Sequence, residues 1–171
     1  MLTTTQTQFQ DRIIGITNHG RSPDLEAIQL GSNLRMSEVS AAIGRAQLRH
    51  LDRWVARRRQ HAERYSEALV NQPLINAPRV RPGSQHAWHQ YCVQTENPTQ
   101  LIAHLDERGI DARRYYTVPC HRQQVYNTHH QFNTELHITE RAAASLVAIP
   151  VMHELTADEQ QQIIEALLDY R

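Results

Sequence analysis

The stretch GSNLRMSEVSAAIGRAQLRHLDRWVARRRQHAERYSEAL, residues 31–69, predicts a polar turn followed by one long helix. Ser37 has the hydroxyl of a helix N-cap. Apolar residues then recur at helical spacing, as Leu48, Leu51, Val55, Ala62, Tyr65 and Leu69. A helix from Ser37 to Leu69 would span about 50 Å, which exceeds the diameter of a small domain. We therefore expect one end of it, the small-residue half around Gly44, to contact a partner.

The segments on either side of this helix predict an α+β fold. A short helix is expected from Thr5 to Ile16. Strands are expected at 74–80, 86–95 and 110–116, the second with Trp88 and Cys92 on one face. Further helices are expected at 97–109, 139–147 and from Ala157, the last with a capping box. The predicted division is a helical segment at 1–71 with a long interface helix, then a small α+β domain at 72–171.

The composition excludes several function classes. Eighteen acidic and eighteen basic residues cancel, so no strong field attracts nucleic acid or anionic lipid. No apolar run approaches the roughly 20 residues that cross a bilayer. The first ten residues lack the pattern of a signal peptide. Because only Cys92 and Cys120 are present, we expect a reduced, cytoplasmic setting. The balanced charge and the lack of a long apolar run predict no nucleic-acid or membrane partner.

All eighteen basic residues are arginine, and none is lysine. A chain of average composition would carry about ten lysines at this length. Chemistry that requires a lysine ε-amine therefore cannot be performed by a side chain of this sequence.

A metal site is a weaker possibility. The candidate ligands do not show the paired spacings of a structural zinc site or of a zinc hydrolase. They are Cys120, His121, His129, His130 and His137. Scattered histidines in a histidine-rich chain explain them better, and we expect no metal.

The run Arg57–Arg59 is compatible with contacts to phosphate groups of a nucleic acid. Consecutive residues point around a helix, however, and Glu63 and Glu67 follow as compensating charges. A solvated helical face is the preferred interpretation.

Five motifs in register over about residues 10–170 resemble the DegT/DnrJ/StrS family of sugar aminotransferases. The turn and helix at 31–69 are similar to the family pattern G-Y-N-x-R-M-S-E-x-x-A-A-I-G-x-x-Q-L. The other four similar strings are ITNHGR, HAWHQYCVQT, LIAHLDERGIDARRYYTVPCH and LVAIPVMHELTADE.

The resemblance implies a fold like the C-terminal small domain of fold-type I enzymes, with a small, mostly antiparallel sheet and helices on one face. These enzymes use pyridoxal phosphate, which a lysine of a larger N-terminal domain holds covalently. This chain resembles the C-terminal part alone, and its lack of lysine agrees with that. We therefore expect it to be inactive by itself and to act as a homodimer or with a lysine-bearing N-terminal half.

By the same resemblance, Asn33 would contact the cofactor phosphate, and Arg35 would lie near a nucleotide-sugar substrate. Tyr116 and His121 match a Y-x-x-P-x-H loop near the substrate entrance. Ser32, Leu34 and Tyr115 depart from the family pattern, which has tyrosine, often an aromatic residue, and histidine at these positions. The alternative is a non-catalytic association module, a degenerate remnant that pairs through the long helix. Substitution of Asn33 and Arg35 would separate these two hypotheses. A half-enzyme reconstituted with its partner would lose activity, whereas association would persist under either hypothesis.

Overall fold

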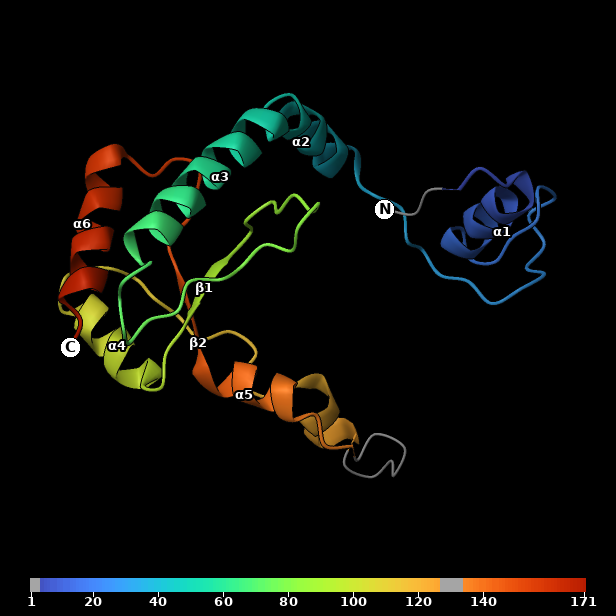
Figure 1. Ribbon diagram of the computed structural model, residues 1–171. Helices are drawn as coiled ribbons and strands as arrows, with labels where there is room; N and C mark the ends of the chain where they lie inside the picture. The colour runs from blue at the N-terminus through green and yellow to red at the C-terminus, as the bar shows by residue number, and fades with distance from the viewer. Residues whose placement is uncertain (1–3, 127–133) are drawn as a thin grey trace. The chain divides into compact units, whose positions relative to one another are not determined.

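The computed structural model describes residues 4–126 and 134–171 and contains two compact units, Met1–His50 and Leu51–Arg171. The first contains α1 (Thr7–Thr17) and α2 (Glu38–Leu48), and the second contains all the remaining elements (Figure 1). The division expected at residues 71 and 72 differs from this one, because α3 (Leu51–Ala68) packs in the second unit.

In the first unit, the chain returns along the end of α1 and pairs with it through backbone hydrogen bonds. The Ser32 amide donates to the Ile16 carbonyl at 2.8 Å, and the His19 amide donates to the Ser32 carbonyl at 3.2 Å. Gly20 and Gly31 make this possible, since a Cβ on Gly31 would overlap the Gly20 backbone. The turn that carries Asn33 is therefore fixed by local main-chain pairing.

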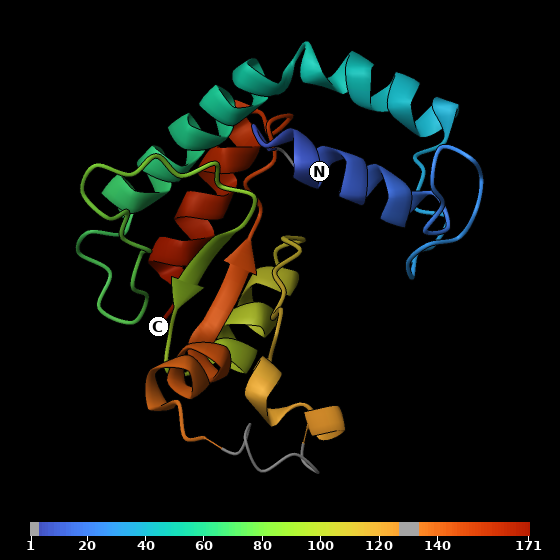
Figure 2. The same cartoon turned by 90° about the vertical axis from the view of Figure 1, so that its right-hand side faces the viewer.

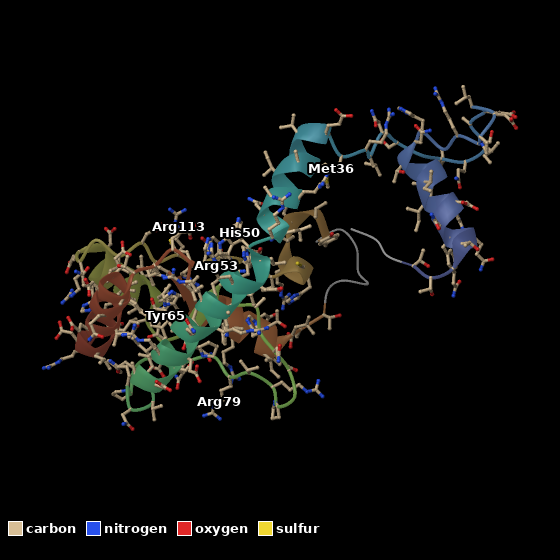
Figure 3. All side chains as sticks on the ribbon, turned by 90° about the horizontal axis from the view of Figure 1, so that it is seen from above. Met36, His50, Arg53, Tyr65, Arg79 and Arg113 are labelled. Atoms are coloured by element: carbon tan, nitrogen blue, oxygen red, sulfur yellow. The ribbon has the colours of Figure 1, made fainter. Side chains whose placement is uncertain are left out.

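The single helix predicted from Ser37 to Leu69 is interrupted at Arg49 and His50, between α2 and α3. Figure 3 labels His50 and, within α3, Arg53. There the His50 amide bonds to the Gln47 carbonyl at 2.9 Å, three residues back instead of four. The predicted start is confirmed, because the Ser37 hydroxyl accepts from the Ser40 amide at 3.2 Å.

The second unit is built on a two-stranded antiparallel sheet of β1 (Tyr91–Gln94) and β2 (Leu146–Ile149), with Tyr91 opposite Ile149. The strands predicted at 74–80 and 110–116 are reduced to single bridges, Asn76 to Gln94 and Arg113 to Ala148. Pro78 has no amide to continue the first pairing, and the left-handed backbone of Tyr116 ends the extended run of the second.

Three helices cover one face of this sheet (Figures 1 and 2). Helix α6 (Ala157–Asp169) contacts both α3 and α4 (Pro98–Asp106), and α4 also contacts β2. Helix α5 (His137–Ser145) runs directly into β2. Two 3₁₀ turns, η1 (Cys120–Arg122) and η2 (Gln124–Tyr126), precede the segment that joins α5. The expected α+β fold with helices on one face of a small sheet is confirmed.

The core lies between these helices and the sheet. Tyr65 of α3, which Figure 3 labels, is fully buried against Tyr91 and donates its hydroxyl to the Pro150 carbonyl at 2.9 Å. Trp88 was expected on the face of Cys92 but packs against Tyr91 in the core. Its left-handed backbone, with φ of 48°, interrupts the alternation before β1 begins, so the prediction was wrong.

Of two other local predictions, one is confirmed and one changes in detail. The capping box of α6 is confirmed, with Thr156 and Glu159 bonded to each other's backbone amides. The side chain of Asn97 makes no capping hydrogen bond at α4. The run Arg57–Arg59 is not a uniformly solvated face, because Arg58 and Arg59 are half-buried and Arg59 donates to the His86 carbonyl at 2.9 Å.

Within residues 4–126 and 134–171, no helix combines the length and apolar character needed to cross a membrane.

Candidate functional site

The Asn33 and Arg35 side chains lie together on the exposed turn of the first unit. The Arg35 Nε donates to Asn33 Oδ1 at 2.9 Å. This bond uses the only acceptor of the pair, so the Asn33 amide nitrogen and the Arg35 terminal nitrogens keep their donors. No hydrogen bond from these donors to another described residue is present. The turn therefore exposes an arginine fork and an amide, donor groups that suit an anion.

In the second unit, the face of the sheet opposite the core borders an apolar cavity of about 380 Å³. Side chains alternate along β1, so Tyr91 and Val93 face the core while Cys92 faces the cavity. Ala148 of β2 lies outside the core cluster and also lines the cavity. Burial raises the pKa of the Cys92 thiol, which makes it a poor nucleophile.

The loop that follows Arg113 supplies the opposite wall of this cavity. Tyr115, Tyr116, Val118, Pro119, Cys120 and Gln123 all line it. Tyr116 is 81% exposed and has a left-handed backbone with φ of 55°. Such a conformation is uncommon for an aromatic residue and occurs more often in binding loops than elsewhere.

His121 follows this loop but does not line the cavity. Its Nε2 donates to Glu140 Oε1 at 3.0 Å, and its side chain is only 11% exposed. Arg122 bonds the same oxygen at 2.8 Å. The hydrogen bond from His121, and then that from Arg122, lower the pKa of Glu140 to about 2. This arrangement anchors the start of α5 to the loop.

The structure thus places the four predicted site residues in two different units. Asn33 and Arg35 share one turn of the first unit, and Tyr116 lines the cavity of the second. His121 lies next to that cavity wall with its ring turned toward Glu140. The four residues therefore form two groups, one in each unit.

Among the described residues, no group of three or more histidine, cysteine, aspartate or glutamate side chains is arranged to hold a metal ion. Of the metal candidates in the sequence, His129 and His130 lie outside the described residues.

Several residues of the second unit were not identified from the sequence. Glu140 has no motif of its own, and its partner His121 lies far back in the sequence, before α5. Gln90 and Ala148 come together only through strand pairing. Tyr116 was named from the sequence, but its left-handed backbone and that of Trp88 were not, because neither position has the glycine or asparagine that favours this conformation.

A sequence model described as the DegT/DnrJ/EryC1/StrS aminotransferase family matches residues 1–168. The chain is 31% identical to the "Pleiotropic regulatory protein" of Geobacillus stearothermophilus, over 99% of this chain and 46% of that protein. It is 30% identical to dTDP-3-amino-3,4,6-trideoxy-alpha-D-glucose transaminase of Streptomyces venezuelae, over 95% of this chain and 43% of that protein. The chain therefore spans about half the length of the curated relatives it matches.

Solved structures of similar fold also match this chain over about half of their length or less. The crystal structure of S. venezuelae DesV superposes with a TM-score of 0.91 at 30% identity, over 98% of this chain and 45% of that one. An aminotransferase of the same family from Brucella abortus gives 0.88 at 27% identity, over 96% and 44%. NtdA from Bacillus subtilis, solved with bound cofactor PMP, shares the fold with a TM-score of 0.85 at 24% identity, over 96% and 40%.

Proposed function

Because the chain belongs to the DegT/DnrJ/EryC1/StrS aminotransferase family, we propose that it is the C-terminal half of a pyridoxal-phosphate-dependent nucleotide-sugar aminotransferase. One observation carries the proposal: the chain matches the family over nearly its whole length, yet its eighteen basic residues are all arginine. Catalysis then depends on a lysine-bearing N-terminal half, and this chain completes the site.

The residues present fit one part of the cofactor. The exposed donors of Asn33 and Arg35 suit phosphate oxygens, since a guanidinium and an amide form charge-assisted hydrogen bonds to them. The covalent attachment must come from elsewhere, because the sequence has no lysine. When bound, pyridoxal phosphate supplies the electron sink that amino-group transfer requires. In this proposal, Asn33 binds its phosphate and Arg35 orients the nucleotide sugar beside it.

The exposed apolar surface of the first unit supports the presence of a partner. Among its described residues only Gly15 and Gly20 are buried, so it has no apolar core of its own. Large apolar side chains are exposed instead, among them Leu30, Leu34, Met36, Val39 and Ile43. An uncovered surface of this kind is typical of an interaction site. In the proposal, the lysine-bearing half covers it, as a separate chain, in a dimer, or as an adjoining part of a longer chain.

The second unit has a different part in the proposal. It folds around its own core and offers the apolar cavity beside Tyr116. Tyr116 would form the wall of the substrate entrance, and Glu140 would hold the His121 ring and the loop in place.

Native purification tests the proposal. The tagged chain is isolated from its source cells, treated with borohydride, and each polypeptide is searched for lysine-linked cofactor by mass spectrometry. Any labelled lysine must belong to a partner or to an adjoining segment, since residues 1–171 contain none. The variant Asn33→Ala should release the cofactor, whereas Asn71→Ala, on an exposed turn of the second unit, should retain it.

Two results oppose the proposal. Recovery of unlabelled chain alone would contradict it. Recovery of a stable partner with no cofactor would instead support the association module that the exposed apolar residues of the first unit also favour.

A further inference from the structure

A second cavity, of about 280 Å³, adjoins the apolar one near the end of the sheet where β1 begins and β2 ends. The two share Gln90, Tyr115 and Ala148 in their linings. The second differs in its chemistry, because its lining also contains charged and titratable side chains, namely Arg58, His89, Asp111, Arg113 and His153. Its volume is close to the lower end for ligand sites, about 300 Å³, so it suits a small ion or one part of a larger ligand.

Arg58 is the informative residue of this cavity. Its neighbour Arg57 donates to the Leu155 carbonyl at 3.3 Å, and Arg59 donates to the His86 carbonyl at 2.9 Å. Arg58 makes no hydrogen bond or ion pair with any described residue, and its Nε is buried without a partner. A buried donor without an acceptor is unfavourable, and it marks a place where an acceptor is missing.

The charges around the cavity leave this arginine uncompensated. Arg113, which Figure 3 labels, forms an ion pair with Asp111 at 2.8 Å. His153 faces Glu154, which does not line the cavity. Within the described chain, no carboxylate lies within 4.0 Å of Arg58. The cavity thus has an excess of positive charge and of hydrogen-bond donors.

We propose that this cavity binds the phosphate group of a small molecule, with Arg58 as the main anchor and Arg113 and His89 at its rim. An arginine fork matches the oxygens of phosphate, and the half-buried position of Arg58 reduces competition from water. The adjoining apolar cavity leaves space for a base or sugar attached to the phosphate. Every residue of this site belongs to the second unit, whereas Asn33 and Arg35 belong to the first.

Calorimetric titration of the purified chain tests this without any partner. Inorganic pyrophosphate and thymidine diphosphate serve as the two probes. We expect saturable binding of both that weakens as sodium chloride is added. Binding of thymidine diphosphate at least about tenfold more tightly would assign the phosphate to a nucleotide that reaches the apolar cavity. Equal affinities would assign it to a free phosphate or pyrophosphate.

Matched arginine variants test whether Arg58 is the main anchor of the phosphate. Arg58→Gln should weaken binding at least about tenfold, while Arg57→Gln, one position away and outside the cavity, should change it less than about twofold. Arg58→Lys retains the charge but loses the fork, and should give an intermediate loss. Circular dichroism checks that each variant is folded, and His89→Gln provides a second, exposed position if Arg58→Gln is not. Absence of saturable binding in the wild type, or equal effects of Arg57→Gln and Arg58→Gln, would overturn the proposal.

Its failure would leave the aminotransferase proposal intact, because that proposal rests on the family match and on the lack of lysine.

Discussion

Both polar atoms of the Gln160 side-chain amide, on α6, form hydrogen bonds with His61 of α3. Its Oε1 accepts from His61 Nδ1 at 2.9 Å, and its Nε2 donates to the His61 carbonyl at 2.9 Å. Arg64 adds a third bond to the same Oε1 at 2.8 Å. Gln160 is fully buried and His61 nearly so, so this polar contact fixes the packing of the two helices.

Replacing Gln160 with leucine should destabilise the second unit by about 1–3 kcal/mol, because the buried His61 donor loses its acceptor. Arg64 is exposed and can hydrogen-bond to water instead. Urea unfolding followed by far-UV circular dichroism measures the loss. Gln161→Leu is the matched control, because Gln161 lies on the exposed side of the same helix and its side chain donates to Glu165, also exposed. Equal losses in the two variants would show that the contact between Gln160 and His61 contributes little.

The capping box of α6 gives a second stability test. Thr156 Oγ1 accepts from the Glu159 amide at 3.2 Å, and Glu159 accepts from the Thr156 amide at 2.8 Å. Thr156→Ala should cost about 1 kcal/mol of unfolding free energy, because an amide at the helix start loses its acceptor. Thr156→Ser keeps the hydroxyl and should remain within about 0.5 kcal/mol of the wild type. If serine were as damaging as alanine, the methyl group of Thr156 would be the important contact.

Local signals in the sequence predicted the helices well. The caps at Ser37 and Thr156 are set by hydrogen bonds within a few residues, so the sequence alone reveals them. The small antiparallel sheet was also expected. Its extent was not, because pairing at Asn76 and Arg113 depends on the path of distant segments. The break between α2 and α3 at His50 could not be predicted, because no proline or glycine lies there.

The parts of the candidate site that are local in sequence could be predicted, whereas the parts assembled from distant segments could not. Asn33 and Arg35 are close in sequence and carry a recognisable motif, so their shared turn could be anticipated. The cavity beside Arg58 combines α3, the approach to β1, the loop after α4 and the end of β2. No single string encodes that assembly. The arginine run was visible in the sequence, but only the carbonyl partners of Arg57 and Arg59 show that Arg58 is the unpaired member.

The pKa of Glu140 predicts how stability changes with pH. It is lowered from 4.5 to about 2, chiefly by the hydrogen bond from His121 and then by Arg122. A lowered carboxylate pKa stabilises the fold fully above the unfolded value, and this contribution is lost as pH falls from about 5 toward 2. Glu140→Gln should therefore be less stable than the wild type at pH 7 and should lose less stability over that acid range.

Urea midpoints measured at intervals between pH 7 and pH 2 would detect this difference. Glu135→Gln makes the same change of charge at a position that is 74% exposed, and it should keep the wild-type pH dependence. A wild-type curve that is flat below pH 5, or a Glu140→Gln curve that is equally steep, would contradict the assignment of the Glu140 carboxylate.

The close contact of Gly31 with Gly20 can be tested against a second glycine of the same unit. A Cβ on Gly31 would overlap the Gly20 backbone, whereas a Cβ on Gly44, inside α2, would have no neighbour within 4 Å. Gly31→Ala should therefore open the pairing that holds the Asn33 turn and speed amide hydrogen exchange of His19 and Ser32 by about tenfold or more. Gly44→Ala should slow exchange within α2 by up to about fivefold, since alanine favours the helix by about 1 kcal/mol. Unchanged exchange at Ser32 in Gly31→Ala would mean that the turn is held by its side chains, and Asn33→Ala would then be the variant that releases it.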